Sequence, residues 1–204
     1  MGYHQAGFNV LGVDIEPQPN YPFTFVQADA LAFVAEHGRE YDAIHASPPC
    51  QAYSPLIYMN ASRGTAGNYK DLIAETRQAL IAADKPYVIE NVPTAPIQGI
   101  KLCGTMFGLM LFRHRLFESN ILLLQPGHVK HRQQGLKAPN IGSRPRLAKG
   151  EVFQLIGNYT RSKEARAHLN IAWMTKAESA QAIPPAYTEF IGRQLIKAVE
   201  KVST

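Results

Sequence analysis

Apolar and β-branched residues gather in short blocks through the first half of the chain. Four of these blocks predict strands, at residues 8–15, 23–28, 41–47 and 85–92. Between them, residues 30–37 and 71–83 carry apolar positions at helical spacing, which predicts helices. Strands that alternate with helices favour an α/β fold with a mostly parallel sheet and helices on both faces.

The second half has a different pattern. Residues 125–150 are rich in Gly, Pro, His, Lys and Arg and show neither a strand period nor a helix period. A loop of that length inside a compact domain is usually functional or mobile. Helical spacing returns at residues 176–182 and again at 185–199.

Composition narrows the class of protein. The chain has 204 residues, of which 46% are hydrophobic and 18% charged, and this excludes disorder or a low-complexity chain as the main state. The length corresponds to one full core with a small appendage. No apolar run approaches the roughly 20 residues of a membrane span. The first residues lack the pattern of a signal peptide, and two cysteines make no disulfide framework, so we expect a cytoplasmic protein with no membrane contact.

Charge is distributed unevenly. Residues 1–100 contain 5 Lys and Arg against 10 Asp and Glu, whereas residues 101–204 contain 16 against 6. A basic segment attracts phosphate backbones, which makes nucleic acid a candidate partner. A solvated basic face on an ordinary enzyme is the alternative.

Reactive side chains follow the predicted strands. Asp14, Asp29, Cys50 and Glu90 stand at or just beyond four strand ends, and ligands of such sheets bind at the carboxyl ends of the strands. Cys50 comes after a rigid Pro-Pro turn and can act as a nucleophile, although a buried structural cysteine is the alternative. A carboxylate such as Glu90 is costly on a buried strand without a task or a partner, and a structural hydrogen bond is its alternative.

Four motifs in order resemble those of the DNA cytosine-5 methyltransferases, particularly compact phage and actinobacterial members. The resemblance runs from Gly2 to about Leu195. The motifs are Pro49-Cys50-Gln51, Glu90-Asn91-Val92, the paired Arg113 and Arg115 within residues 108–117, and residues 183–192.

The resemblance implies a Rossmann-like methyltransferase that uses S-adenosylmethionine. The Cys50 thiolate would add to C6 of a cytosine flipped out of the duplex, and Glu90 would hydrogen-bond or protonate N3. Arg115 would bind the base O2 and orient Glu90, with Arg113 as the other member of the arginine pair. An amino-methyltransferase is disfavoured, because Ser47-Pro48-Pro49-Cys50 stands where that class has an Asp/Asn-Pro-Pro-Tyr/Phe motif.

The cofactor positions carry over in the same way. Asp14 would accept the ribose hydroxyls, Ile15 would pack on the adenine and Asp29 would accept from the adenine amino group, with Pro49 and Tyr187 nearby. Ordinary strand-end caps are the alternative for the two aspartates.

The resemblance also implies double-stranded DNA as the partner of a monomeric enzyme. Gln51 and residues 53–67 would close over the flipped base, with Ser54 and Asn91 beside it. Residues 1–118 would be catalytic, 119–170 a basic target-recognition region and 171–204 helices returning to the catalytic domain. Arg132, Arg144 and Arg146 would contact DNA, unless this face is merely solvated. His128 and His131 resemble half of a zinc site, but no cysteine accompanies them in the sequence, so no metal is expected.

The match fails at two places. The glycine-rich cofactor loop with which the family begins is missing, since the chain starts on the helix that follows it, and Met110 and Leu111 replace the usual Pro and Gln. A misassigned start or a true truncation would explain the first departure. A catalytically impaired DNA-binding remnant and an RNA cytosine-5 methyltransferase are the competing functional hypotheses.

Overall fold

The computed structural model describes residues 1–54, 69–136, 151–152 and 162–202. They form two compact units, each built from separate stretches of the chain. Unit 1 comprises residues 1–10, 102–114 and 125–193, and unit 2 comprises residues 11–101, 115–124 and 194–204. The class is α/β, as predicted. Within the described ranges, no helix is long and apolar enough to cross a membrane.

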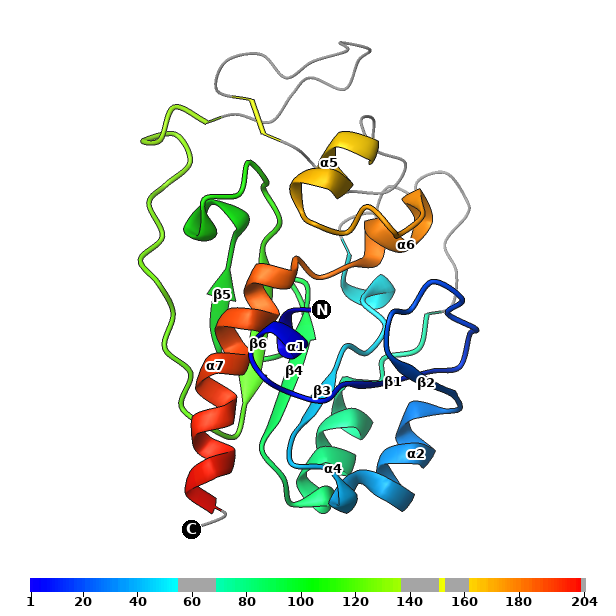
Figure 1. Ribbon diagram of the computed structural model, residues 1–204. Coiled ribbons are helices and arrows are strands. Elements are labelled where there is room, and N and C mark those ends of the chain that lie inside the picture. The colour runs from blue at the N-terminus through cyan, green and yellow to red at the C-terminus, as the bar shows by residue number, and fades with distance from the viewer. Residues whose placement is uncertain (55–68, 137–150, 153–161, 203–204) are drawn as a thin grey trace. The chain divides into compact units, whose positions relative to one another are not determined.

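Unit 2 contains two small sheets (Figure 1). In the first, β1 (Leu11–Asp14) pairs in parallel with β2 (Thr24–Gln27). The second has the strand order β3 (Ile44–Ala46), β4 (Tyr87–Asn91), β6 (Arg115–Ser119) and β5 (Ile100–Leu102). β3 and β4 are parallel, but β4 and β6 are antiparallel, so this sheet is mixed rather than mostly parallel.

Two helices pack together in unit 2. They are α2 (Ala30–His37) and α4 (Ile73–Ala83). α2 begins at residue 30 because the Asp29 carboxylate caps it, accepting from the backbone N–H groups of the first turn. α4 buries Ile73 and Leu80 in one cluster with Ile89 of β4. This packing fixes the position of β4, whose five residues are all buried.

Unit 1 is mainly helical in its described part. It contains α1 (Gly2–Gln5), the 3-10 helix η3 (Gly104–Phe107), α5 (Ser162–His168), α6 (Lys176–Gln181) and the first part of α7 (Pro185–Val202). α1 lies so close to α7 that a Cβ atom on Gly2 would stand 2.1 Å from the Pro185 carbonyl oxygen. α6 begins where Thr175 and Glu178 form a capping box.

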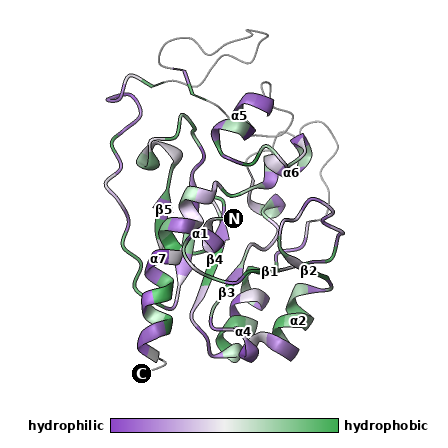
Figure 2. Cartoon of the chain, viewed as in Figure 1, coloured by the Kyte–Doolittle hydropathy of each residue, from purple (hydrophilic) through white to green (hydrophobic). Residues whose placement is uncertain are grey.

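The long helix α7 shows how sequence pattern becomes packing. Tyr187, Ile191 and Leu195 are spaced by four residues and are all buried. Figure 2 shows hydrophobic and hydrophilic residues mixed along this helix, as expected of an element with one buried side.

Most predicted elements are present, but two strands were not predicted. Each predicted strand or helix block contains an observed element of the same type, and α2 has the predicted bounds. β5 spans only three residues, and β6 carries Arg115 and Glu118, whose charges hide the strand pattern. The antiparallel β6 is therefore the main correction to the predicted parallel sheet. The predicted division at residues 118 and 170 remains a prediction.

Candidate active site

Cys50 lies in the turn that follows β3, in unit 2. Pro48 and Pro49 end the strand, and Cys50 then precedes the 3-10 helix η2 (Gln51–Tyr53). The backbone N–H of Tyr53 donates to the Cys50 carbonyl oxygen at 3.1 Å, which closes this turn. Cys50 is half-buried and packs against the cluster that contains Ile89 and Val92. The thiol therefore has a defined position on the core and keeps some access to solvent.

Hydrogen bonds from the end of β4 hold the Cys50 turn. The Asn91 side chain donates from Nδ2 to the Pro48 carbonyl oxygen at 3.0 Å, and its Oδ1 accepts from the Val92 N–H at 2.9 Å. Beyond Cys50, the Thr94 hydroxyl donates to the Tyr53 carbonyl oxygen at 2.5 Å. The turn is thus fixed on both sides of Cys50, by the last residue of the neighbouring strand and by a residue just after it.

Glu90, near the end of β4, forms an ion pair with Arg115 of β6. Arg115 Nε lies 2.8 Å from Glu90 Oε1, and the two side chains are only 16% and 8% exposed. In the antiparallel register Glu90 faces Phe117, so Arg115 is its diagonal neighbour on the same face of the sheet. A buried carboxylate needs such a partner to remain charged. The pairing implied for Arg115 is present in the structure.

A second arginine–glutamate pair lies on the opposite face of the same strands. Glu118 comes next to Phe117, so it points away from Glu90. Arg77 of α4 contacts Glu118 through two hydrogen bonds, of 2.6 and 2.9 Å. The Arg77 guanidinium holds the pKa of the Glu118 carboxyl below its usual value. This pair joins α4 to β6 and is structural.

Tyr53 is the titratable neighbour of Cys50 along the chain. Burial, together with the Asp71 carboxylate, raises the pKa of Tyr53 to about 12. The phenol is consequently neutral at physiological pH and is a poor candidate for a general base.

Arg113 lies in unit 1, whereas Cys50, Glu90 and Arg115 all lie in unit 2. The Arg113 side chain is buried and donates from Nη2 to the Ala180 carbonyl oxygen at 2.9 Å. Its own carbonyl oxygen accepts from the Tyr187 hydroxyl at 2.6 Å. Tyr187 is fully buried. The structure thus gives both residues a packing role in unit 1, and their catalytic and cofactor roles remain predictions.

The other predicted cofactor residues lie at the ends of β1 and β2 and after β3. Asp14 Oδ1 accepts from the Glu16 N–H at 2.9 Å, and Asp29 Oδ1 accepts from Leu31 and Ala32 at 2.9 and 3.0 Å. Both carboxylates therefore act as caps, which was the alternative considered for them. Ile15 is 65% exposed, so its side chain offers an apolar surface. Pro49 lies in the Cys50 turn.

The structure describes only some of the predicted DNA contacts. Gln51 is exposed on η2, Ser54 and Asn91 lie beside the Cys50 turn, and Arg132 is exposed in a turn of unit 1. Arg144, Arg146 and most of the predicted closing loop, residues 55–67, lie outside the described residues.

No metal was expected because no cysteine accompanies His128 and His131 in the sequence, but the fold brings a cysteine to them. Cys103 and His114 lie beside His128 and His131 in unit 1, and the possible ligand atoms of all four are within 4.8 Å of one another. Sequence reasoning missed this group because its four members are separated by 10, 13 and 2 residues. The one sequence signal was the short spacing of His128 and His131, which are two of the four members of the cluster.

Comparisons with known proteins add no family assignment. No protein-family model matches the chain, and no curated protein or solved structure is significantly similar to it. The geometry itself places a half-buried thiol, a paired carboxylate and an anchoring amide within unit 2, at the ends of two adjacent parallel strands. Such a group is suited to nucleophilic attack on a polar substrate with proton transfer.

Proposed function

We propose that this protein is a DNA cytosine-5 methyltransferase with a Rossmann-like cofactor-binding sheet, acting in the cytoplasm on double-stranded DNA. One observation carries the proposal: the ends of the parallel strands β3 and β4 hold Cys50 and the Arg115-paired Glu90, and Asn91 ties the two ends together. The sequence motifs add support to the proposal. Three of the four motifs, in the order expected of the family, contain Cys50, Glu90 and Arg115.

The first step uses Cys50 and Glu90 together. The Cys50 thiolate forms a bond to C6 of the cytosine, and the electron pair of the C5–C6 double bond moves toward N3. The Glu90 carboxylate takes up the proton that the Cys50 thiol gives up and donates it to N3, which prevents negative charge from accumulating on the ring. The carboxylate that remains is stabilised by the Arg115 guanidinium at the observed 2.8 Å contact. C5 thereby becomes nucleophilic.

The second step restores the aromatic ring. S-adenosylmethionine, when bound, supplies the methyl group that C5 takes up. The C5 proton then passes to a base or water, the Cys50–C6 bond breaks, and Glu90 recovers the N3 proton. Asn91 acts as a positioning residue, because its bond to Pro48 holds the turn that presents Cys50.

The predicted cofactor residues fit the adenosine part of this group. Each capping contact of Asp14 and Asp29 uses Oδ1, and a carboxylate has a second oxygen that can accept from a ribose hydroxyl or an adenine amino group. The exposed Ile15 side chain is suited to packing against a flat ring. Arg132, exposed in a basic turn, is suited to contacting phosphate.

Exchange of the cytosine C5 hydrogen with solvent tests the first step without the cofactor. Cys50 addition, protonation of C5 and reversal release tritium from duplex DNA labelled at C5. We expect release by the full chain and none by Cys50→Ala. Absence of release in both proteins, with duplex DNA and RNA alike, would contradict the proposal. Release from RNA alone would replace DNA by RNA as the substrate.

Trapping tests methyl transfer. Fluorine at C5 cannot leave as a proton, so duplex DNA carrying 5-fluorocytosine should form a stable adduct in the presence of S-adenosylmethionine. We expect a shifted band on a denaturing gel with the full chain and no shifted band with Cys50→Ala. DNA binding without exchange or adduct would instead identify a non-catalytic DNA-binding protein.

A further inference from the structure

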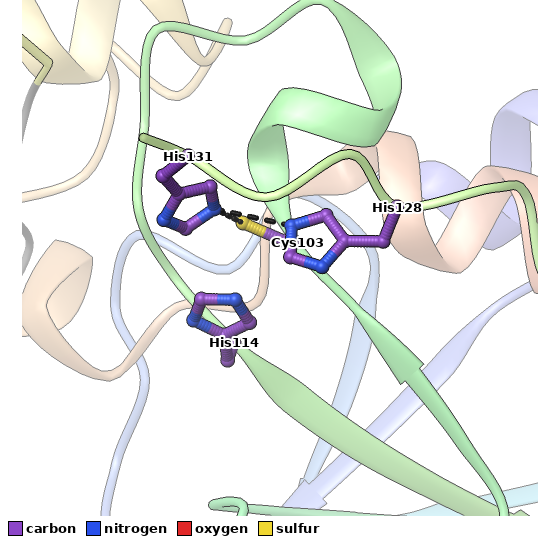
Figure 3. A group of neighbouring side chains, drawn as sticks. All are labelled: Cys103, His114, His128 and His131. Atoms are coloured by element: carbon purple, nitrogen blue, oxygen red, sulfur yellow. Dashed lines mark hydrogen bonds between the residues drawn. The ribbon is translucent and has the colours of Figure 1, made fainter. Parts of the chain in front are cut away.

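The second cysteine of the chain faces three histidines in unit 1. Cys103 is fully buried just before η3, and His114 ends the adjoining stretch of unit 1. His128 and His131 come from the later segment, residues 125–136. Figure 3 shows the four side chains directed toward one another.

The spacing of the possible ligand atoms is close to that around a tetrahedral ion. Cys103 Sγ lies 3.3 Å from His131 Nε2, and the Nε2 atoms of His128 and His131 are 3.1 Å apart. Tetrahedral zinc, with bonds of about 2.3 Å to sulfur and about 2.0 Å to nitrogen, places its ligand atoms roughly 3.3–3.6 Å from each other. All of the possible ligand atoms lie within 4.8 Å of one another.

Hydrogen bonds account poorly for this arrangement. His131 Nε2 faces both the Cys103 sulfur and His128 Nε2. A neutral imidazole nitrogen has either one hydrogen or one lone pair, so it cannot make two well-formed hydrogen bonds. A metal ion accepts one lone pair from each ligand, and it therefore satisfies all of the facing atoms at once.

The surroundings match those of a metal ligand shell. The Thr105 hydroxyl donates toward Cys103 Sγ at 3.6 Å, a contact of the kind that orients a metal ligand. The Phe112 ring stacks on His131 with ring centres 3.8 Å apart and planes only 4° from parallel, which orients that imidazole. Gly104 allows the backbone next to Cys103 to approach Leu111 closely, because a Cβ atom there would stand 2.4 Å from the Leu111 carbonyl oxygen.

We propose that Cys103, His114, His128 and His131 bind a divalent transition-metal ion, zinc by preference, as a structural site with four protein ligands. One thiolate and three imidazoles form a donor set suited to zinc. With all four tetrahedral positions filled by protein, the ion has no open position for a substrate, which distinguishes the site from a catalytic one.

The ion would fasten a segment that has little regular structure. Residues 125–136 include no helix or strand, and within the described chain His131 starts a turn closed by the Leu136 N–H donating to the His131 carbonyl oxygen at 3.1 Å. The metal would tie the base of this turn to residues 103–114. Lys130 and Arg132 flank His131, so the site would also orient two of the basic side chains.

Metal content and cobalt spectroscopy test the proposal. The full chain, purified without a histidine tag, should contain one zinc per molecule by elemental mass spectrometry. After exchange into Co²⁺, it should show intense visible bands of tetrahedral cobalt and a sulfur-to-cobalt charge-transfer band. We expect Cys103→Ser to lose the charge-transfer band. His128→Gln, which changes a half-buried residue, should lower the metal affinity by roughly 10²-fold or more.

His37→Gln is the matched control, because His37 belongs to unit 2, whereas all four residues of the cluster belong to unit 1. It should bind metal as the unchanged protein does, and circular dichroism should show that both histidine variants fold. Absence of metal from the purified protein together with cobalt spectra that Cys103→Ser does not change would overturn the proposal. Equal loss of metal in His37→Gln and His128→Gln would do the same. None of these outcomes depends on methyltransferase activity.

Discussion

The chain contains two cysteines, which differ in their burial and in the groups that surround them. Cys50 is half-buried in a turn held by backbone and amide hydrogen bonds, with an arginine-paired carboxylate on the next strand. Cys103 is fully buried and faces imidazole nitrogens and a hydroxyl. The first environment suits the proposed nucleophile, whereas the second suits the proposed metal site. The two residues are of the same type, so only their surroundings indicate different functions.

The largest expected effect is that substitution of each cysteine removes a different property of the protein. Cys50→Ala should lower cytosine C5 hydrogen exchange by about 10³-fold or more, because no other group replaces the proposed nucleophile. Its metal content should equal that of the unchanged protein. Cys103→Ser should lose metal, and its exchange rate per folded molecule should fall far less. A variant that lost both properties together would show that the two sites are not independent.

The next largest effect is expected when the glutamates of the two arginine–glutamate pairs are substituted in turn. Glu90→Gln should reduce exchange by roughly 10²–10⁴-fold, because the proposed proton donor to N3 is removed. Glu118→Gln, on the opposite face of the same pair of strands, should leave the exchange rate per folded molecule within a few-fold. Equal losses in both variants would contradict a catalytic role for Glu90 and favour a general effect on the sheet.

The free energy of unfolding should depend on pH through the Glu118 carboxyl. Glu118→Gln, which places an uncharged amide there, should remove this dependence. Its pKa is about 4.5 in an ordinary environment and lower in the folded protein, because Arg77 favours the carboxylate. The pair therefore stabilises the fold fully above pH 4.5, and this contribution is lost as the pH falls through the folded pKa. Denaturant unfolding should show a loss of about 1–3 kcal/mol in Glu118→Gln at neutral pH and a flatter acid dependence. An unchanged acid dependence would argue against the pair.

The smallest expected effect concerns the neighbour of the second cysteine. Thr105→Val removes the hydroxyl that donates toward Cys103 and preserves the size of the side chain. Metal affinity, measured by competition with a chelator, should fall roughly tenfold. Thr94→Val is its counterpart at the first cysteine, since the Thr94 hydroxyl donates to Tyr53. It should leave metal affinity unchanged.

The parts of the fold set by neighbouring residues were predictable. α2 and α6 begin where Asp29 and Thr175 cap them, and such caps can be read directly from the chain. β6 was missed because Arg115 and Glu118 project from it toward partners that lie far away in sequence. Local pattern does not contain those partners.

The same division holds for the candidate active site. The motifs pointed to Cys50, Glu90 and Arg115, and the structure places all three in unit 2. The Asn91–Pro48 bond spans 43 residues and depends on the register of β3 against β4, so no local signal predicts it. The cluster around Cys103 was missed for the same reason, since its four members come together only through tertiary packing.

The glycine after Cys103 adds a sequence signature by which the second cluster can be sought in related proteins. Gly104 has no room for a side chain, so the cysteine should appear in related sequences as Cys-Gly, followed by His114, His128 and His131 at similar intervals. A partial set would leave a buried thiol beside unmatched imidazoles, and selection should therefore retain or discard the four ligands together. Their joint presence or absence would divide homologues into two lineages without any assay.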